Sequence, residues 1–233
     1  MHQLTHTPFI PSCPVCRRAN TKRIQHRRVA DKEKKVADDG SFGRWITCDL
    51  VTPYIGDTIE AVGDIKNSIL FYDVNTGWMY CKSLRAKTEE EIKHAFKMFA
   101  DPGKIGNCHS DREEGIKGAC ESLGIGHTMG TAGAPQENAK IERQTQVLAR
   151  GARALLCAAG LPQAFWTFAA STFCFLKNIT PDMTGSSPWK KRYGRNEAEK
   201  DKKKFKGVIA PFGSYVLYYP PSTTKEYKQQ QNI

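Results

Sequence analysis

The chain has 233 residues, of which 39% are hydrophobic and 10% aromatic. These values are typical of a globular protein with one substantial core and exclude a largely disordered chain. The amino terminus has no charged leader followed by an apolar stretch, so we expect no secretory signal. Eight cysteines without an export signal predict mostly buried free thiols, and the apolar segment 158–176 predicts a buried helix rather than a membrane span.

The net charge of +11 is concentrated in two segments. Residues 17–35 carry +7 and residues 190–206 carry +6, which leaves −2 for the rest of the chain. Segregated basic arms favour a nucleic-acid partner, because each phosphate that they neutralise releases condensed counterions. The alternative is that the Lys-rich segments are solvated linkers that keep the protein soluble.

Three strands are predicted in the first half of the chain. Residues 45–51, with the sequence WITCDLV, are rich in β-branched and aromatic residues and stop before Pro53. Residues 64–74 and 78–84 predict two more strands, because the Asn-Thr-Gly sequence between them is typical of a hairpin turn.

Helices and strands alternate after the third strand. Thr88, followed by three Glu residues, predicts a capped helix start, and Asp101-Pro102-Gly103 predicts its end. The patterns that follow predict short strands over 104–109 and 125–129, a short helix over 113–123 closed by Gly124, a long helix over 135–158 and another over 162–178. This order predicts an α/β fold with a mixed sheet and helices on both faces.

The tail after Pro181 is basic and contains one apolar run, residues 208–219, which predicts one or two strands. The composition after Pro220-Pro221 is typical of disorder. We therefore expect the chain to stop in the middle of a longer protein.

Three carboxylates occur at positions that favour chemistry. Asp49 lies inside the first strand, where an ionised carboxylate is costly unless it is paired, hydrogen-bonded or bound to a metal. Asp111 follows a strand and precedes a helix, at the end of the sheet where open α/β folds bind ligands. Glu142 lies on the long helix, about 100° from the apolar position Ile141 and on the same face as Asn138 and Gln146.

Each carboxylate also has a purely structural interpretation. Asp49 is satisfied by an Arg or a backbone amide, Asp111 is a helix N-cap, and Glu142 is a surface residue that favours the helix dipole. Taken together, however, one carboxylate in the first strand, one after a later strand and one on the next helix are expected to converge at one sheet edge. Such a set suits two divalent ions, with Mg²⁺ (or Mn²⁺) as the natural occupant.

The motifs around these residues are similar to the integrase of copia-type retrotransposons, within the retroviral integrase and DDE transposase superfamily. WITCDLVTP at 45–53 resembles the strand of the first Asp, His109-Ser110-Asp111 resembles the second segment, and PQENAKIER at 135–143 resembles the Glu helix. Further likeness lies in Gly160-Leu161-Pro162 with Trp166, in Leu176-Lys177-Asn178 with Pro181, in 187–194 and in 212–216. The resemblance covers about residues 13–219.

The resemblance implies a ribonuclease H-like mixed five-stranded sheet and a polynucleotidyl transferase. Water attacks near the 3′ end of the element's DNA, and the new 3′ hydroxyl then attacks target DNA. Asp49, Asp111 and Glu142 are the implied catalytic residues and metal ligands, whereas Asn138, Lys140, Arg143 and Gln146 are candidates for DNA contact. The resemblance further implies DNA and copies of the same chain as partners, no membrane partner, and action in the nucleus after a cytoplasmic particle stage.

The family pattern also implies three regions. Residues 1–40 correspond to a remnant of a zinc-binding module with a basic linker, residues 41–180 to the catalytic core, and residues 181–233 to a basic, partly disordered extension. Cys13 and Cys16 resemble the end of the family's His-His-Cys-Cys module. His2 and His6 come too soon to build that unit, so we expect the chain to lack its beginning, although the four side chains can in principle bind tetrahedral Zn²⁺.

Three departures from the family pattern leave alternatives open. Arg112-Glu113-Glu114 follows Asp111 where the family usually has Asn-Gly, thirty residues separate Asp111 from Glu142, and Ala139 replaces a Gly. One alternative is therefore a degenerate, catalytically inactive module of the same fold that binds nucleic acid. Another is a ribonuclease H-like nuclease, which shares the fold and the metals but only hydrolyses.

Overall fold

The computed structural model describes residues 12, 40–52, 61–101, 103–130, 139–194 and 205–215. From Gly40 onward they contain a five-stranded sheet of order β3-β2-β1-β4-β5. β2 is antiparallel to β1 and β3, whereas β1, β4 and β5 are parallel. The strands are β1 (Trp45–Val51), β2 (Asn67–Asp73), β3 (Met79–Leu84), β4 (Asn107–Ser110) and β5 (Gly126–Met129). The predicted mixed sheet of five strands is confirmed.

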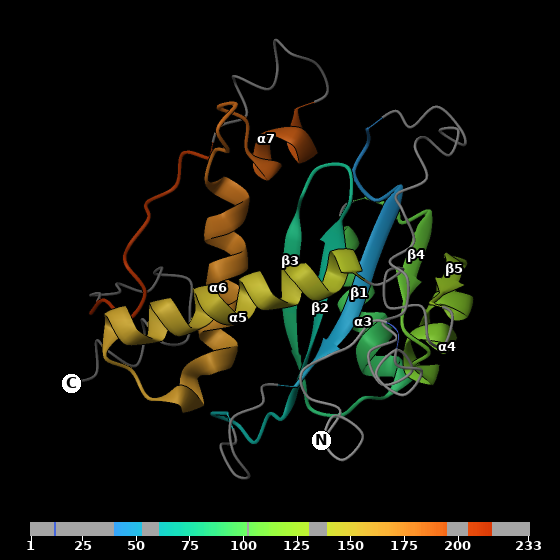
Figure 1. The fold of residues 1–233 in the computed structure, drawn as a ribbon, viewed down its shortest axis with the longest axis horizontal. Helices are drawn as coiled ribbons and strands as arrows, with labels where there is room; N and C mark the ends of the chain where they lie inside the picture. The colour runs from blue at the N-terminus through green and yellow to red at the C-terminus, as the bar shows by residue number, and fades with distance from the viewer. Residues whose placement is uncertain are drawn as a thin grey trace, which may run out of the picture. The chain divides into compact units, whose positions relative to one another are not determined.

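Helices cover both faces of this sheet, as predicted. In Figure 1, α5 (Ala139–Ala159) crosses in front of the strands, while α3 (Glu89–Ala100) lies behind them. α4 (Glu114–Leu123) packs with α3, and α6 (Trp166–Ile179), which follows the 3-10 turn η1 (Gln163–Phe165), packs with α5. The last described helix is the short α7 (Pro188–Tyr193).

Strand β2 is buried on both faces and therefore separates two hydrophobic cores. Phe71 points toward the α3 side, where its ring centroid lies 4.8 Å from that of Phe96 and 5.1 Å from that of Phe99. Leu70 points to the opposite side and belongs to the core beneath α5 and α6, together with Ile141. Burying each side chain of this size contributes roughly 1.5–3 kcal/mol, so the two cores hold both helical layers on the sheet.

The predicted helix signals operate as expected. Thr88 is the N-cap of α3, and its hydroxyl oxygen accepts a hydrogen bond from the Glu91 amide at 3.4 Å. Gly124 ends α4 in the left-handed region at φ 67°, a conformation that glycine adopts without steric cost. α4 is thereby followed directly by β5.

Side chains of α6 satisfy the outer edge of β3. Asn178 is buried, accepts a hydrogen bond from the Met79 amide at 2.9 Å and donates one to the Met79 carbonyl at 2.7 Å. Ser171 donates to the carbonyl of Cys81 at 3.1 Å. Because an open strand edge invites pairing with other chains, these bonds close part of the edge within the molecule itself.

α7 packs against the α3 face through aromatic side chains. The rings of Trp189 and Tyr193 lie 5.8 and 5.7 Å from that of Trp78. Arg192 stacks at 3.8 Å over the ring of Phe42 and donates hydrogen bonds to two backbone carbonyls, those of Phe99 and Asp101. One cation of the basic segment 190–206 is thus engaged with the core rather than presented to a partner.

Two predicted strands differ in the structure. Residues 64–66 precede β2 instead of forming it, because Ala61 and Ile65 form an isolated bridge around a turn in which Asp64 has φ 59°. The described part of the run 208–219, residues 208–215, contains no strand, so that prediction is wrong there. Pro211 and Gly213 turn the chain, and the Ser214 amide bonds back to the Pro211 carbonyl.

The cysteine prediction is confirmed for the described residues. Their six cysteines are free thiols, of which only Cys157 is exposed. None of the helices in the described ranges combines the length and apolar character that crossing a bilayer requires.

Candidate active site

Asp49 lies in β1, just beyond the point where β4 stops pairing with it. The parallel pairing ends at Thr47 and His109, while the antiparallel pairing with β2 continues through Asp49 and Leu70. The side chain is half-buried and accepts a hydrogen bond from the Leu50 amide. Asp49 is therefore fixed by a central strand at the place where the neighbouring strand leaves the sheet.

The electrostatic surroundings of Asp49 are unfavourable for a carboxylate. Burial, and to a smaller extent the negative charges of Asp111 and Glu142, together raise its pKa to about 6. The hydrogen bond from Leu50 acts in the opposite direction but is outweighed. The fold thus brings all three predicted carboxylates within electrostatic range of one another.

Asp111 follows the carboxyl end of β4 and is exposed. The N-cap position of α4 belongs to Glu113, whose side chain makes no capping bond. The Asp111 carbonyl accepts a hydrogen bond from the Glu113 amide at 2.9 Å, while the carboxylate group has no capping role. The alternative interpretation of Asp111 as a helix cap is therefore wrong.

Glu142 lies in the first turn of α5, next to the buried Ile141. Its side chain is exposed, as the surface interpretation expects, yet its charge acts on Asp49. Within the described residues, no group of three His, Cys, Asp or Glu side chains is already close enough together to hold a metal ion. The charges of Asp111 and Glu142 thus act on Asp49, but the three carboxylates do not form a cluster tight enough to hold a metal ion.

Three of the buried polar atoms that have no hydrogen-bond partner among the described residues belong to residues close in sequence to a carboxylate: Thr47 Oγ1, His109 Nε2 and Thr145 Oγ1. Thr47 is two residues from Asp49, His109 is two residues from Asp111, and Thr145 is one helical turn from Glu142. Buried polar groups are usually satisfied, so each of these atoms indicates a position where water or a ligand completes the hydrogen bonding.

Sequence comparison links the chain to a retrotransposon protein. It is 25% identical over 187 residues to the retrovirus-related Pol polyprotein from transposon TNT 1-94 of Nicotiana tabacum. The match covers 75% of this chain but only 13% of that polyprotein, so the chain spans about an eighth of the relative's length. No family model matches the chain.

Structural comparison leads to retroviral integrases. The HTLV-2 integrase catalytic core domain, solved in complex with magnesium, matches with a TM-score of 0.50 and 14% identity, over 66% of this chain and 98% of that one. The catalytic core domain of BIV integrase has a TM-score of 0.49 and 17% identity, over 69% and 98%. This chain has the fold of an integrase catalytic core. The predicted resemblance to retrotransposon integrases is confirmed, and the ribonuclease H-like fold class with it.

The predicted DNA-contact residues on α5 are exposed where they are described. Lys140, Arg143 and Gln146 all lie on the surface of this integrase-like core, beside Glu142 along the helix. Asn138 lies outside the described residues, as do the four zinc candidates, His2, His6, Cys13 and Cys16.

A hydrogen-bond network between β4 and β5 was missed by the sequence analysis. Ser110 Oγ lies 2.9 Å from His127 Nε2 and donates to the Asp111 carbonyl at 2.9 Å. On the other sheet face, His109 Nδ1 lies 3.0 Å from Thr128 Oγ1. The register that pairs Cys108 with His127 creates both contacts. Aligning the two short strands, 107–110 and 126–129, is the signal that would have revealed them.

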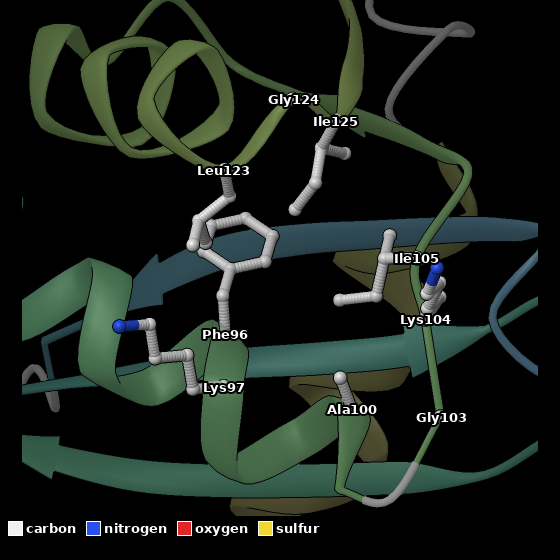
Figure 2. A pocket seen from close by; sticks show the side chains of 9 residues that line it. All are labelled: Phe96, Lys97, Ala100, Gly103, Lys104, Ile105, Leu123, Gly124 and Ile125. Atoms are coloured by element: carbon white, nitrogen blue, oxygen red, sulfur yellow. The ribbon is translucent and has the colours of Figure 1, made fainter.

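Two cavities differ in their relation to the carboxylates. One, of about 440 Å³, begins at Val51 and Thr52 and extends past Thr145 between α5 and α6, but none of the three carboxylates lines it. The other, of about 420 Å³, is lined by the side chains that Figure 2 labels, among them Phe96, Ile105 and Ile125. It lies at the amino ends of β4 and β5, whereas Asp111 follows the carboxyl end of β4. Of these two cavities, the first is lined by residues close in sequence to Asp49 and Glu142, and the second is not.

Proposed function

We propose that this chain is the catalytic core of a retrotransposon integrase, which binds DNA and catalyses metal-dependent 3′-end processing and strand transfer. The observation that carries the proposal is the electrostatic convergence of Asp49, Asp111 and Glu142 from β1, the end of β4 and the first turn of α5. A carboxylate whose pKa is raised by burial and by two like charges is more costly than a structural role requires, and such sites are typical of function.

The residues present fit divalent cations. Asp49, Asp111 and Glu142 offer the hard oxygen ligands that Mg²⁺ and Mn²⁺ prefer, and positive charge would relieve the repulsion that raises the pKa of Asp49. When bound, two such ions supply charge stabilisation to the attacking and leaving oxygens of a phosphoryl transfer. The unpartnered polar atoms of Thr47, His109 and Thr145 support a hydrated site beside these ligands.

The three ligands have different mobility. Asp49 is held by β1 between two neighbouring strands, and with a pKa of about 6 it is mostly ionised at neutral pH. Asp111 and Glu142 are exposed, so their side chains can rotate toward Asp49 without disturbing the core. We infer that Asp49 fixes the site and that the other two carboxylates close on it when cations and DNA bind.

Each of the two reactions exchanges one phosphodiester bond. In processing, the attacking water oxygen bonds to a phosphorus near the 3′ end while the P–O bond to the leaving 3′ oxygen breaks, and that oxygen becomes the new 3′ hydroxyl. In strand transfer, this 3′ oxygen bonds to a phosphorus of the target strand while the P–O bond to a target oxygen breaks, and that oxygen leaves as a hydroxyl. One P–O bond forms for each that breaks, so neither step requires an external energy source. The task of the protein is to orient the strands and stabilise charge.

DNA is expected to lie along α5. Lys140, Arg143 and Arg150 are exposed on the helix that carries Glu142, and Gln146 is exposed one turn from that carboxylate. These side chains, like the Lys and Arg residues of the basic segments, can neutralise DNA phosphates. We further propose that copies of the chain assemble on the DNA ends and that the functional assembly acts in the nucleus.

Strand transfer of an oligonucleotide in Mg²⁺ or Mn²⁺ tests the proposal. Wild type is compared with Asp111→Asn, which removes a ligand charge, and with the matched control Asp64→Asn. Asp64 is exposed and has φ 59°, a conformation that Asn tolerates. We expect Asp111→Asn to lose at least about 100-fold in rate, and Asp64→Asn to retain wild-type activity. Equal rates in all three proteins would refute catalysis at this site.

The same experiment separates the alternatives. The absence of a preassembled metal cluster among the described residues is the observation that favours an inactive module. Salt-dependent DNA binding without turnover in either metal would support that module, whereas hydrolysis without joining would support a nuclease.

A further inference from the structure

We infer that His127 is a positioning residue for Asp111 and acts through the hydroxyl of Ser110. This inference rests on the proposed function, because it assigns a task to Asp111. It arises from the hydrogen-bond chain that links the edge strand β5 to the backbone of the second carboxylate residue.

The direction of the chain follows from its donors. The Asp111 carbonyl can only accept, so the single proton of the Ser110 hydroxyl is donated to it, at 2.9 Å. The Ser110 oxygen then accepts from His127, at 2.9 Å, which requires the proton of the imidazole to be on Nε2. Ser110 is fully buried, so losing the His127 partner leaves its hydroxyl without replacement by bulk water.

Further bonds hold the two strands together around Asp111. The Gly130 amide donates to the Ser110 carbonyl at 3.1 Å, which extends the β4–β5 pairing past the last residue of β4. Arg112 Nε donates to the Gly130 carbonyl at 3.4 Å. Asp111 is thereby bracketed by contacts of Ser110 and Arg112, while its own side chain stays exposed.

This arrangement assigns a specific consequence to the His127 side chain. The direction in which the backbone leaves β4 decides where the Asp111 carboxylate lies relative to Asp49. The Asp111 carbonyl is held by two donors, the Ser110 hydroxyl and the Glu113 amide, and only the first of them is linked to His127. Mutating a group that orients a metal ligand typically lowers metal affinity by roughly 10–100-fold. We therefore expect His127 to act on cation affinity rather than on folding alone.

The test measures Mn²⁺ binding from the electron paramagnetic resonance of the free ion, which needs neither DNA nor turnover. His127→Phe keeps a ring but removes the donor, Ser110→Ala removes the relay, and His127→Gln places an N–H donor at about the reach of Nε2. His94→Phe is the matched control, because His94 is an exposed histidine on α3. Thermal unfolding of each variant is recorded in parallel.

We expect His127→Phe and Ser110→Ala each to weaken Mn²⁺ binding by about tenfold, and the double variant to weaken it no further. His127→Gln is expected to stay within about twofold of wild type, because it restores the donor to Ser110. His94→Phe is expected to bind as wild type does. Wild-type affinity in both His127→Phe and Ser110→Ala, with only the melting temperature lowered, would overturn the inference and leave a structural role.

Asp111→Asn in the same titration distinguishes the two proposals. If Asp111→Asn weakens Mn²⁺ binding while His127→Phe does not, the positioning role fails and the proposed function stands. If wild type binds Mn²⁺ no more tightly than Asp111→Asn, the metal site itself is refuted and both proposals fall.

Discussion

Asp73 and Asp49, two aspartates of neighbouring strands, occupy opposite electrostatic environments. Asp73 ends β2, is fully buried and accepts three hydrogen bonds at 2.6–2.8 Å, from the Gly43 amide and from the amide and hydroxyl of Thr76. Asp49 is half-buried and has one described backbone donor, Leu50, while Asp111 and Glu142 repel it.

The source of the compensating hydrogen bonds or charges separates a structural carboxylate from a functional one. Around Asp73 the protein itself supplies the hydrogen-bond donors, so the carboxylate is compensated within the fold. The bonds from Thr76 to Asp73, and from the Trp78 amide to the Thr76 hydroxyl, also hold the turn that leads to Trp78. Around Asp49 the protein supplies further negative charge, so compensation must come from outside. Burial alone does not make this distinction, since Asp73 is the more buried of the two.

The same substitution at both positions should give opposite results, and Asp73→Asn carries the largest effect. The amide nitrogen of Asn cannot accept the hydrogen bonds that Asp73 receives from the Gly43 amide and from the amide and hydroxyl of Thr76. At least one of these buried donors would therefore lose its acceptor. We expect a loss of about 2–4 kcal/mol in the free energy of unfolding, measured by urea denaturation. Asp64→Asn, at an exposed turn, is the control and should change stability little. An Asp73→Asn variant as stable as wild type would remove the structural half of the comparison.

The Arg192 contacts extend the structural region and give the second-largest effect. Arg192→Met keeps an unbranched side chain but loses the stacking on Phe42 and the bonds to two carbonyls. We expect a loss of about 2 kcal/mol in the free energy of unfolding, measured by the same urea titration. Lys191→Met, which removes only an exposed pair with Asp182, should cost much less. Equal losses in both variants would show that Arg192 is not part of the core.

Most of the fold follows from local patterns in the sequence. The period of apolar residues and the signals at Thr88 and Gly124 predicted the elements, because each depends on neighbours only a few residues away. The predicted strand in 208–219 failed because Pro211 and Gly213 turn the chain inside an apolar run. The engagement of Arg192 with the aromatic cluster was also hidden, since charge patterning cannot tell a solvated cation from one that stacks on distant rings.

The candidate site was predictable in part. The sequence placed one carboxylate in a strand, one after a later strand and one on the next helix, so it predicted that Asp49, Asp111 and Glu142 would converge. Their roles stay predictions. Asp73 gave no signal, because its donors come from Gly43, 30 residues away, and from a turn whose geometry the sequence leaves open. The link from His127 through Ser110 to Asp111 depends on the register of β4 and β5. A shift of that register by one residue would abolish the link, and the sequence does not specify the register.

Asp49→Asn should act in the opposite direction to Asp73→Asn, with a smaller magnitude. It removes the charge that burial, Asp111 and Glu142 disfavour. Because the site is partly exposed and therefore screened, we expect a gain of roughly 1 kcal/mol in the free energy of unfolding at pH 7 without divalent cations. The same variant should lose strand transfer, so stability and activity move in opposite directions. A loss of stability comparable to that of Asp73→Asn would place Asp49 in the structural class.

The pH dependence of that gain is the smallest effect and the sharpest test. The pKa of Asp49 is about 6 in the folded protein against 3.8 for an ordinary Asp, so the folded state binds the proton more tightly than the unfolded state does. The contribution of the Asp49 carboxyl to wild-type stability should therefore be fully present below about pH 4 and be lost as the pH rises through 6, whereas Asp49→Asn lacks this contribution. Urea titrations of both proteins should show a difference near zero at pH 4 that grows to its full value by pH 7. Added Mn²⁺ at pH 7 should shrink the difference by stabilising wild type alone. If the difference in stability between the two proteins does not depend on pH, the fold does not raise the pKa of the Asp49 carboxylate. The contrast with Asp73 would then lose its electrostatic basis.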